Sequence, residues 1–373
     1  MKQFKGIAAN IDMPVLGLVS RNPFSLSRCG QVLVSEGLSL LAKGFSGVIT
    51  GEIKDKTSQA HVKLTDGSSE LVDGDCVLID KDGMVTVVWE KHAPMNPLLL
   101  TEACDCQCLM CPQPPKVHEK RLTETAKKIL NLVKVGDDQT ICLTGGEPTL
   151  LKEDFFAILE LIGNKHPNSN VMMLTNGKSF ADFQFTKRFV QTRPANFISC
   201  VSMHSDVDEV HDRIVGIKDS FYKTAMGLQN LARFREKIEI RVVVNRLNAQ
   251  RLEAIANFIQ RNFPFIYHCA FMGMEITGLA RDNYEDVWID PYDYRDQLSK
   301  AVKVLSRANM YVSIYNLPLC LLKSASWAYA RKSISGWKKD YVLACESCSK
   351  KEDCCGIFTT SGLHLSPHIQ SIL

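Results

Sequence analysis

The chain has 373 residues, of which 45% are hydrophobic and 23% are charged, as in an ordinary soluble globular protein. This length allows one large domain with one or two small ones. The 44 basic and 41 acidic residues leave a net charge of +3, which is too small to indicate binding to nucleic acid or to an anionic membrane. The sequence shows neither a signal-peptide pattern nor the roughly 18 consecutive apolar residues of a membrane span, so we expect a cytoplasmic protein.

Residues 1–95 contain short strand-like runs that are separated by turn signals, for example "GVITGEI" and "CVLIDKDGMVTVVWE". Asp-Gly pairs at 66–67 and 82–83 predict hairpin turns. We therefore expect a small β-rich domain, a barrel or a sandwich, at residues 1–95. Its sequence points to no particular chemistry, and both a binding platform and a structural cap agree with it.

Residues 96–318 alternate between apolar strand-like runs and amphipathic helical stretches. Helices are predicted over 153–165, 180–190, 221–234, 249–262 and 293–307, each after a strand-like run. Roughly six such units predict an α/β fold with a parallel sheet that forms a partial (β/α)6 barrel, too few for a closed eight-fold one. In such folds the chemistry lies at the carboxyl ends of the strands, where polar residues gather in this sequence.

Fourteen cysteines are many for a reducing compartment, and most of them fall into two groups. Clustered thiols without a signal peptide indicate metal binding rather than disulfides. The first group is Cys104, Cys106, Cys108 and Cys111, and the second is Cys345, Cys348, Cys354 and Cys355, with Cys320 upstream. The scattered cysteines are interpreted as buried thiols that act as small hydrophobic side chains: Cys29, Cys76, Cys142, Cys200 and Cys269.

The spacing Cys104-x3-Cys108-x2-Cys111 places three thiolates on one short loop. Such a loop can hold three irons of a 4Fe-4S cluster and leave the fourth iron without a protein ligand. A structural zinc site normally pairs two Cys-x2-4-Cys knuckles, and here only one is present. The spacing alone favours an iron–sulfur cluster but leaves zinc open.

The next strand-like run ends in "LTGGEPTL", where Gly145 and Gly146 let the backbone approach a ligand and Glu147 and Pro148 follow. The three-cysteine loop and this Gly-Gly-Glu segment together resemble the radical S-adenosylmethionine (radical SAM) superfamily. The resemblance implies a 4Fe-4S cluster at Cys104, Cys108 and Cys111. It also implies that residues 145–148 bind the methionine amino group of S-adenosylmethionine, which would be cleaved to a 5′-deoxyadenosyl radical. Cys106 is interpreted as a thiol outside the ligand set.

The same resemblance assigns further residues to the cofactor. The family usually has an aromatic residue before the third cysteine to contact adenine, and Met110 takes that place here. Asn176, Ser202 and His204 lie at strand ends where the family binds ribose or the methionine carboxylate, and Arg241 is expected to pair with that carboxylate. Glu275, in "FMGMEITG", is expected near the cofactor.

The second cysteine group predicts a further metal centre. Cys345, Cys348 and Cys354 lie on one short loop, and Cys320 is a fourth candidate ligand from another segment. Four thiolates suit a second 4Fe-4S cluster or, equally, a zinc ion. The layout resembles the auxiliary-cluster (SPASM/twitch-like) extensions of peptide-modifying radical SAM enzymes. The predicted division is therefore a β-rich domain at 1–95, a radical SAM partial barrel at 96–318 and a cysteine-rich auxiliary-cluster extension at 319–373.

Several stretches resemble, more narrowly, the HxsC-type radical SAM maturases of the His-Xaa-Ser system: "CLMCPQPP", "HDRIVGIKDSFYKTAMGL", "YNLPLCLL", "SISGWKKDY" and "CESCSKKEDCCGIF". That resemblance implies post-translational modification of a ribosomally made precursor peptide with His-Xaa-Ser repeats. It also implies a sister radical SAM maturase as a partner and an electron donor such as flavodoxin or ferredoxin.

Two other classes of function remain open from the sequence. One is a radical SAM enzyme that acts on a small molecule, such as nucleotide cyclisation in molybdenum-cofactor synthesis. That family has a Cys-x2-Cys-x13-Cys second site and an Arg-rich tail ending in Gly-Gly, neither of which is present here. The other is a non-catalytic zinc or iron–sulfur partner protein, against which the intact three-cysteine loop and Gly-Gly-Glu segment argue.

Overall fold

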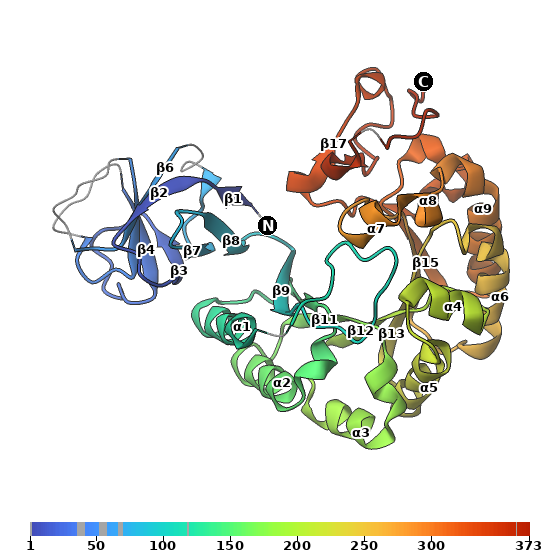
Figure 1. Ribbon diagram of the computed structural model, residues 1–373, viewed down its shortest axis with the longest axis horizontal. Coiled ribbons are helices and arrows are strands. Elements are labelled where there is room, and N and C mark those ends of the chain that lie inside the picture. Colours follow the sequence, from blue (N-terminus) through green and yellow to red (C-terminus); the bar gives the residue numbers. More distant parts are fainter. Residues whose placement is uncertain (1, 36–41, 52–57, 66–69, 118, 363) are drawn as a thin grey trace.

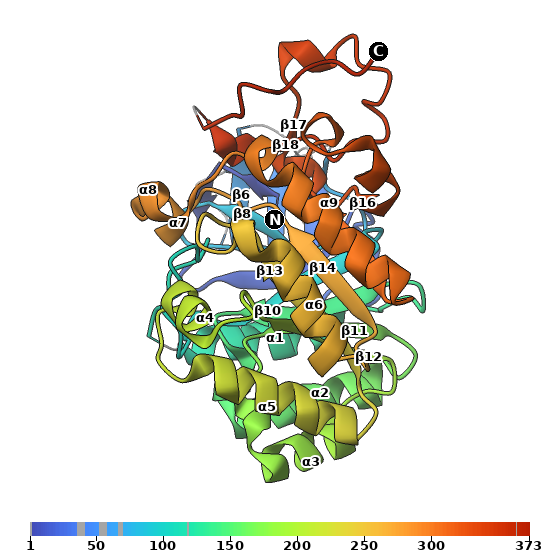
Figure 2. The same cartoon turned by 90° about the vertical axis from the view of Figure 1, so that its right-hand side faces the viewer.

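A computed structural model describes residues 2–35, 42–51, 58–65, 70–117, 119–362 and 364–373. The N-terminal strands form one sheet, drawn in blue in Figure 1, and the remaining main strands form a second, curved sheet with helices along its outer side. The C-terminal residues, red in Figures 1 and 2, lie together at one end of the molecule in both views.

The N-terminal sheet is closed into a barrel by its first residues. Its strand order is β1-β8-β7-β3-β4-β5-β6-β2, so β1 and β2 are the two edges. Only Lys5 separates β1 from β2, so this segment pairs with β8 on one side and β6 on the other and joins the two edges. The strands are β1 (Gln3–Phe4), β2 (Gly6–Ala9), β3 (Val15–Ser20), β4 (Gln31–Ser35), β5 (Gly47–Thr50), β6 (His61–Leu64), β7 (Cys76–Ile79) and β8 (Val85–Trp89).

One of the two predicted hairpin turns lies in the described residues. β7 and β8 pair antiparallel, and Asp82–Gly83 lies in the turn between them, where the amide of Gly83 donates to the carbonyl of Asp80 at 3.0 Å. The prediction of a hairpin at 82–83 is therefore confirmed. The predicted turn at 66–67 lies outside the described residues.

The second sheet is the partial barrel that the alternation of residues 96–318 predicted. All eight strands are parallel, in the order β16-β15-β14-β13-β12-β11-β10-β9. The six strands from β9 to β14 each lead into a helical segment. The strands β15 and β16 extend the sheet beyond the predicted units. The strands are β9 (Met95–Thr101), β10 (Thr140–Gly145), β11 (Asn170–Thr175), β12 (Phe197–Ser202), β13 (Lys237–Val243), β14 (His268–Met272), β15 (Tyr311–Tyr315) and β16 (Ala330–Arg331).

The helices lie on the outer side of this curved sheet (Figure 1). Two of them begin at a side-chain cap: the carboxylate of Asp182 accepts two amides at the start of α3, and Asp290 caps α9 just before Pro291. The five predicted helices are present as α2, α3, α5, α6 and α9. The helices are α1 (Lys120–Leu132), α2 (Glu153–Lys165), α3 (Phe183–Thr192), α4 (Asp208–Val215), α5 (Ser220–Arg233), α6 (Leu252–Asn262), α7 (Leu279–Asp282), α8 (Tyr284–Val287) and α9 (Pro291–Arg307).

The two faces of the curved sheet differ in burial. Side chains on the outer face, such as Ile141, Met173 and Ile240, are fully buried against the helices. Alternate residues on the concave face, such as Leu174 and Arg241, are only half-buried. Because side chains alternate along a strand, this pattern leaves the concave side partly open to solvent.

The C-terminal residues add short 3-10 turns and one two-stranded pair, β17 (Lys339–Asp340) with β18 (Ile357–Phe358). Within the described part of the chain, no helix combines the length and the apolar character that a membrane span needs.

Candidate functional site

The first cysteine group lies on the loop that follows β9, on the concave side of the sheet (Figure 1). This loop is fixed by backbone hydrogen bonds to α4 and to the start of α7. Three of these bonds join Gln107 N to Val215 O, Leu109 N to Ile214 O and Leu279 N to Cys111 O, each at 2.9 Å. The loop is thus anchored to two different parts of the barrel domain, α4 and the start of α7.

The two glycines at the end of β10 pack directly against this loop. Gly146 N donates to Thr101 O and Glu147 N donates to Ala103 O, both at 2.8 Å. A Cβ atom on Gly145 would lie 2.1 Å from the carbonyl oxygen of Thr101, and one on Gly146 would lie 2.2 Å from that of Ala103. Gly145 also has a φ of +147°, which residues with side chains rarely adopt. Glycine is therefore required at both positions for the strand end and the cysteine loop to meet.

We expect Gly146→Ala to destabilise the protein by about 1–3 kcal/mol, because its methyl group would overlap the backbone of Ala103. Gly163→Ala is the matched control, since nothing lies within 4 Å of a Cβ there and the residue is inside α2. That change should stabilise the helix by about 0.5–1 kcal/mol. Anaerobic urea unfolding of both variants measures the difference, and equal midpoints would show that the close approach is not required.

The carboxylate of Glu147 faces inward and is 1% exposed. It accepts hydrogen bonds from the amide and hydroxyl of Thr149, from the hydroxyl of Thr175 and, at 2.7 Å, from the amide of Asn176. Burial raises the pKa of Glu147 above its ordinary value, and these bonds oppose that effect. The side chain thus ties the end of β10 to the end of β11, which leaves the backbone of 145–147 as the part of this segment that faces the loop.

The thiols of the first group differ in exposure. Cys104, Cys108 and Cys111 are half-buried, whereas Cys106 is buried. Among the described residues, the sulfurs of Cys104 and Cys106 and a carboxylate oxygen of Asp105 lie within 4.8 Å of one another, and Cys108 and Cys111 are not part of this set. The cysteine thiolates on this loop are soft donors, the type that iron–sulfur clusters use.

Asp105 and Lys178 are part of this site, although the sequence analysis did not select them. Lys178 Nζ lies 2.9 Å from a carboxylate oxygen of Asp105, and the side chain of Asn176 donates to the other carboxylate oxygen at 2.8 Å. Their sequence signal was a charged residue between two cysteines and a lysine two positions after Asn176. Neither pattern indicates a contact by itself.

Ser202 and Arg241 lie side by side at the ends of β12 and β13, where the register pairs them directly. Arg241 Nε donates to Glu239 Oε1 at 2.5 Å, and the other carboxylate oxygen of Glu239 bonds to His268 Nδ1 at 2.7 Å. Burial opposes ionisation of Glu239, but the hydrogen bond from His268 and the charge of Arg241 outweigh it and lower the pKa of Glu239 to about 2. The guanidinium is therefore held in place at the open face of the sheet.

Met110 and Glu275 are engaged with other parts of the protein. The sulfur of Met110 accepts from Asn245 Nδ2 at 3.4 Å, and its side chain packs in a small buried cluster with Ile214 and Ala280. The carboxylate of Glu275 is paired with Lys338 at 2.8 Å and also accepts from the hydroxyl of Thr360 at 3.0 Å. Glu275 thus connects the segment after β14 to the C-terminal residues, and its contact with a cofactor stays a prediction.

His204 is buried against His211 of α4, with the two ring centroids 5.9 Å apart. The backbone amide of His204 donates to Nδ1 of His211, and Nε2 of His211 has no hydrogen-bond partner among the described residues. Burial lowers the pKa of His204 to about 3 and that of His211 to about 4. Both rings are therefore neutral at physiological pH.

This pair predicts a loss of stability at mildly acidic pH. An unfolded histidine has a pKa of about 6.5, so the unfolded chain binds more protons than the folded one as the pH falls below that value. At about pH 5.5 each ring is expected to lower the free energy of unfolding by about 1.4 kcal/mol relative to pH 8, and the pair by roughly 2–3 kcal/mol. Urea unfolding of the wild type and of His204→Gln/His211→Gln at both pH values measures this, and an equal pH dependence in the two proteins would contradict it.

Four cysteines of the second region line one pocket: Cys320, Cys345, Cys348 and Cys354. The sulfur of Cys354 accepts from the amides of Leu319 and Gly356, each at 3.4 Å. Hydrogen bonding by Cys355, together with these amides, outweighs burial and lowers the pKa of Cys354 to about 6. Cys355 is buried, does not line this pocket and donates to the carbonyl of Gly356. Four thiols thus share one pocket, and thiolates are donors that both zinc and iron–sulfur centres use.

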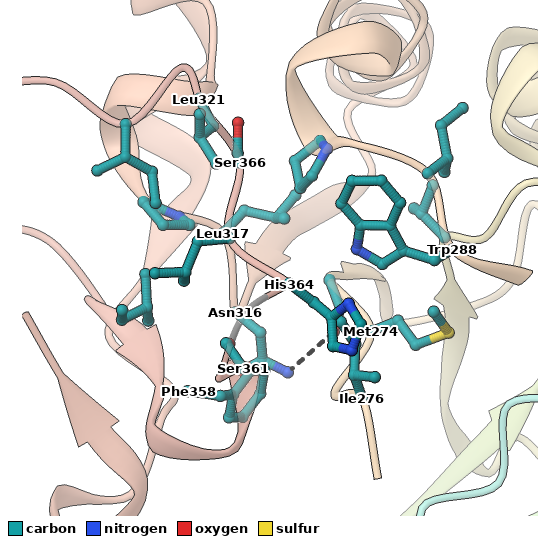
Figure 3. Close-up of a pocket in the computed structure, with 18 of the residues that line it drawn as sticks. Met274, Ile276, Trp288, Asn316, Leu317, Leu321, Phe358, Ser361, His364 and Ser366 are labelled. Atoms are coloured by element: carbon teal, nitrogen blue, oxygen red, sulfur yellow. Dashed lines mark hydrogen bonds between the residues drawn. The ribbon is translucent and has the colours of Figure 1, made fainter. Parts of the chain in front are cut away.

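A second pocket lies between the ends of β13, β14 and β15 and the C-terminal residues, as Figure 3 shows. Side chains from the strand ends, among them Met274, Asn316 and Leu317, face Phe358 and His364 of the C-terminal segment across it. Trp288 closes a further side (Figure 3). Most of its lining residues are apolar, and Asn316, Ser361, His364 and Ser366 add polar groups.

Comparison with known proteins gives distant relatives. The chain is 24% identical to Fe-coproporphyrin III synthase of Methanosarcina barkeri over 200 residues, which are 52% of this chain and 46% of the relative. It is 28% identical to GTP 3′,8-cyclase of Mannheimia succiniciproducens over 174 residues, 44% of this chain and 49% of the relative. The chain thus spans about half the length of these relatives.

Among solved structures, the chain is similar to SuiB of Streptococcus suis bound to S-adenosylmethionine, with a TM-score of 0.45 and 14% identity over 60% of this chain and 51% of that chain. It is also similar to a radical SAM methyltransferase from Sphaerobacter thermophilus, with a TM-score of 0.44 and 12% identity over 65% of this chain and 73% of that chain. A sequence model of the radical SAM superfamily matches residues 98–288, which is more than half of the chain. This protein belongs to the radical SAM superfamily.

Proposed function

We propose that this protein cleaves S-adenosylmethionine reductively and uses the resulting 5′-deoxyadenosyl radical to modify a ribosomally made peptide with His-Xaa-Ser repeats. The proposed cleavage of S-adenosylmethionine rests on the cysteine loop. Its half-buried thiols lie on the concave side of the sheet and are packed against a Gly-Gly turn that tolerates no side chain. This arrangement is what an open-cornered iron–sulfur site requires.

In this proposal Cys104, Cys108 and Cys111 would hold a 4Fe-4S cluster, which would supply one electron for reductive cleavage of S-adenosylmethionine. The backbone of Gly145 and Gly146 lies beside the loop and would orient the amino group of the methionine moiety. Glu147 and Pro148 fix the turn that presents this backbone, since the carboxylate of Glu147 is already saturated by hydrogen bonds. The protein's part is to position the cofactor and to shield it from water.

Arg241 and Ser202 are proposed to bind the methionine carboxylate or the ribose. Among the described residues, only Nε of the Arg241 guanidinium has a hydrogen-bond partner, so its terminal nitrogens are available for a bidentate contact. Asn176, which follows β11, is likewise proposed to bind the ribose or the methionine carboxylate. Met110, His204 and Glu275 make their contacts within the protein, and we propose that they support the walls of the site.

We further propose that Cys320, Cys345, Cys348 and Cys354 hold a second 4Fe-4S cluster. Their common pocket and the two amide donors to Cys354 support this assignment. A zinc ion would use the same four thiolates, and an iron and sulfide count distinguishes the two. The peptide substrate is supported by the sequence stretches that resemble the His-Xaa-Ser maturases, and the pocket in Figure 3 lies beside the strand ends.

A small-molecule substrate is the second candidate, since one of the relatives is a GTP 3′,8-cyclase and another is a probable one. The two functions are separated by incubating the iron-loaded protein with S-adenosylmethionine, dithionite and either a synthetic His-Xaa-Ser repeat peptide or GTP. We expect a mass change in the peptide that depends on S-adenosylmethionine, and none in a peptide of scrambled sequence. Conversion of GTP with an unchanged peptide would refute the peptide assignment.

A further inference from the structure

An ion pair joins the cysteine loop to the segment after β11, and the proposed function does not use it. Asp105 stands between Cys104 and Cys106 in the chain, and one of its carboxylate oxygens lies within 4.8 Å of both sulfurs. Lys178 Nζ contacts this residue twice, at 2.9 Å to the carboxylate and 3.0 Å to the backbone carbonyl. A positive and a negative charge are thus fixed beside the proposed ligand Cys104.

The lysine of this pair is buried, whereas the side chain of Asp105 is 41% exposed. The side chain of Lys178 is 7% exposed, and burying an ammonium group is unfavourable unless it has close partners. Asn176 holds both charges in place, because its Nδ2 donates to Asp105 Oδ1 at 2.8 Å and its Oδ1 accepts from the amide of Lys178 at 3.0 Å. The two charges therefore keep fixed positions relative to the loop.

The loop has other anchors besides this pair, because its backbone bonds to α4, to α7 and to the end of β10 involve other residues. Lys178 adds a bond to the carbonyl of Asp105 at 3.0 Å, and its buried ammonium group also exerts an electric field on the loop. In a site partly excluded from water, such a field acts strongly on any nearby change of charge.

We propose that Lys178 and Asp105 set the reduction potential of the iron–sulfur cluster at this loop, Lys178 raising it and Asp105 lowering it. This inference rests on the proposed function. In the step concerned, a low-potential donor gives up one electron and the cluster gains it, so the cluster becomes more negative by one charge. A nearby cation stabilises the reduced form and a nearby carboxylate destabilises it. The pair thereby controls how readily the electron for sulfonium cleavage becomes available.

The test is a redox titration followed by electron paramagnetic resonance, with dithionite as reductant. The signal that changes on addition of S-adenosylmethionine identifies the cluster whose potential is followed. We expect a more negative midpoint in Lys178→Met, a more positive midpoint in Asp105→Asn and a near wild-type midpoint in the double variant. Lys178→Arg should keep the wild-type value. Lys127→Met is the matched control, because it removes an equally close ion pair with Asp154 on the outer helices.

The design separates an electrostatic role from a structural one. Lys178→Met and Asp105→Asn break the same ion pair, so loosening of the loop would shift both midpoints in the same direction. Shifts in the same direction, or unchanged midpoints in fully loaded proteins, would overturn the inference and leave the proposed function intact. A purified wild type that holds no iron–sulfur cluster would instead refute the proposed function, and the inference with it.

Discussion

Cys354→Ala is expected to remove about four of about eight iron atoms per chain, whereas Cys355→Ala should leave the iron content unchanged. The physical reason is the different position of the two neighbouring thiols. Cys354 lines the same pocket as Cys320, Cys345 and Cys348, and its sulfur accepts two backbone amides that stabilise a thiolate. Cys355 is buried outside this pocket.

Iron and acid-labile sulfide are counted in both variants after anaerobic purification. The two cysteines are adjacent, so each variant is the other's control for a change in this loop. Loss of iron in Cys355→Ala with full loading of Cys354→Ala would reverse the assignment. Zinc instead of the second set of irons in the wild type would show a structural zinc site.

Replacing Cys104, Cys108 or Cys111 with alanine is expected to remove the other set of about four irons and with it the paramagnetic signal that responds to S-adenosylmethionine. With only two of the three proposed ligands left, two of the four iron corners would lack a protein ligand. The three proposed ligands are half-buried, and the backbone of their loop is fixed by bonds to α4 and α7.

Cys106→Ala is the control within the same loop. Cys106 is buried and accepts from Asn176 Nδ2 at 3.5 Å, so we interpret it as part of the loop's packing. This variant should retain the signal and the iron. If Cys106→Ala loses the cluster while Cys108→Ala or Cys111→Ala keeps it, Cys106 belongs to the ligand set in place of that residue.

Much of the fold could be predicted from the sequence because it follows local patterns. The predicted helix at 153–165 matches α2 in both bounds, since its apolar residues recur at helical spacing and acidic residues begin it. The parallel sheet followed from the alternation of strands and helices. The sequence analysis gave no bounds for α1, which follows the cysteine loop, or for β15, which has five residues.

Contacts between distant segments could not be predicted. The closure of the N-terminal barrel depends on the two ends of one short segment reaching strands far along the chain. The pairing of Glu275 with Lys338 joins residues 63 positions apart, and that of Lys178 with Asp105 joins residues 73 apart. A pattern of residue types identifies the motif, but only the packing of the barrel decides which charged residues form ion pairs.

The central claim is that the cysteine loop supports reductive cleavage of S-adenosylmethionine. It is tested most directly by incubating anaerobically purified, iron-loaded protein with S-adenosylmethionine and dithionite and measuring 5′-deoxyadenosine. We expect 5′-deoxyadenosine from the wild type and from Cys355→Ala, and none above background from Cys111→Ala. No product from well-loaded wild type, or equal product from Cys111→Ala, would contradict the claim.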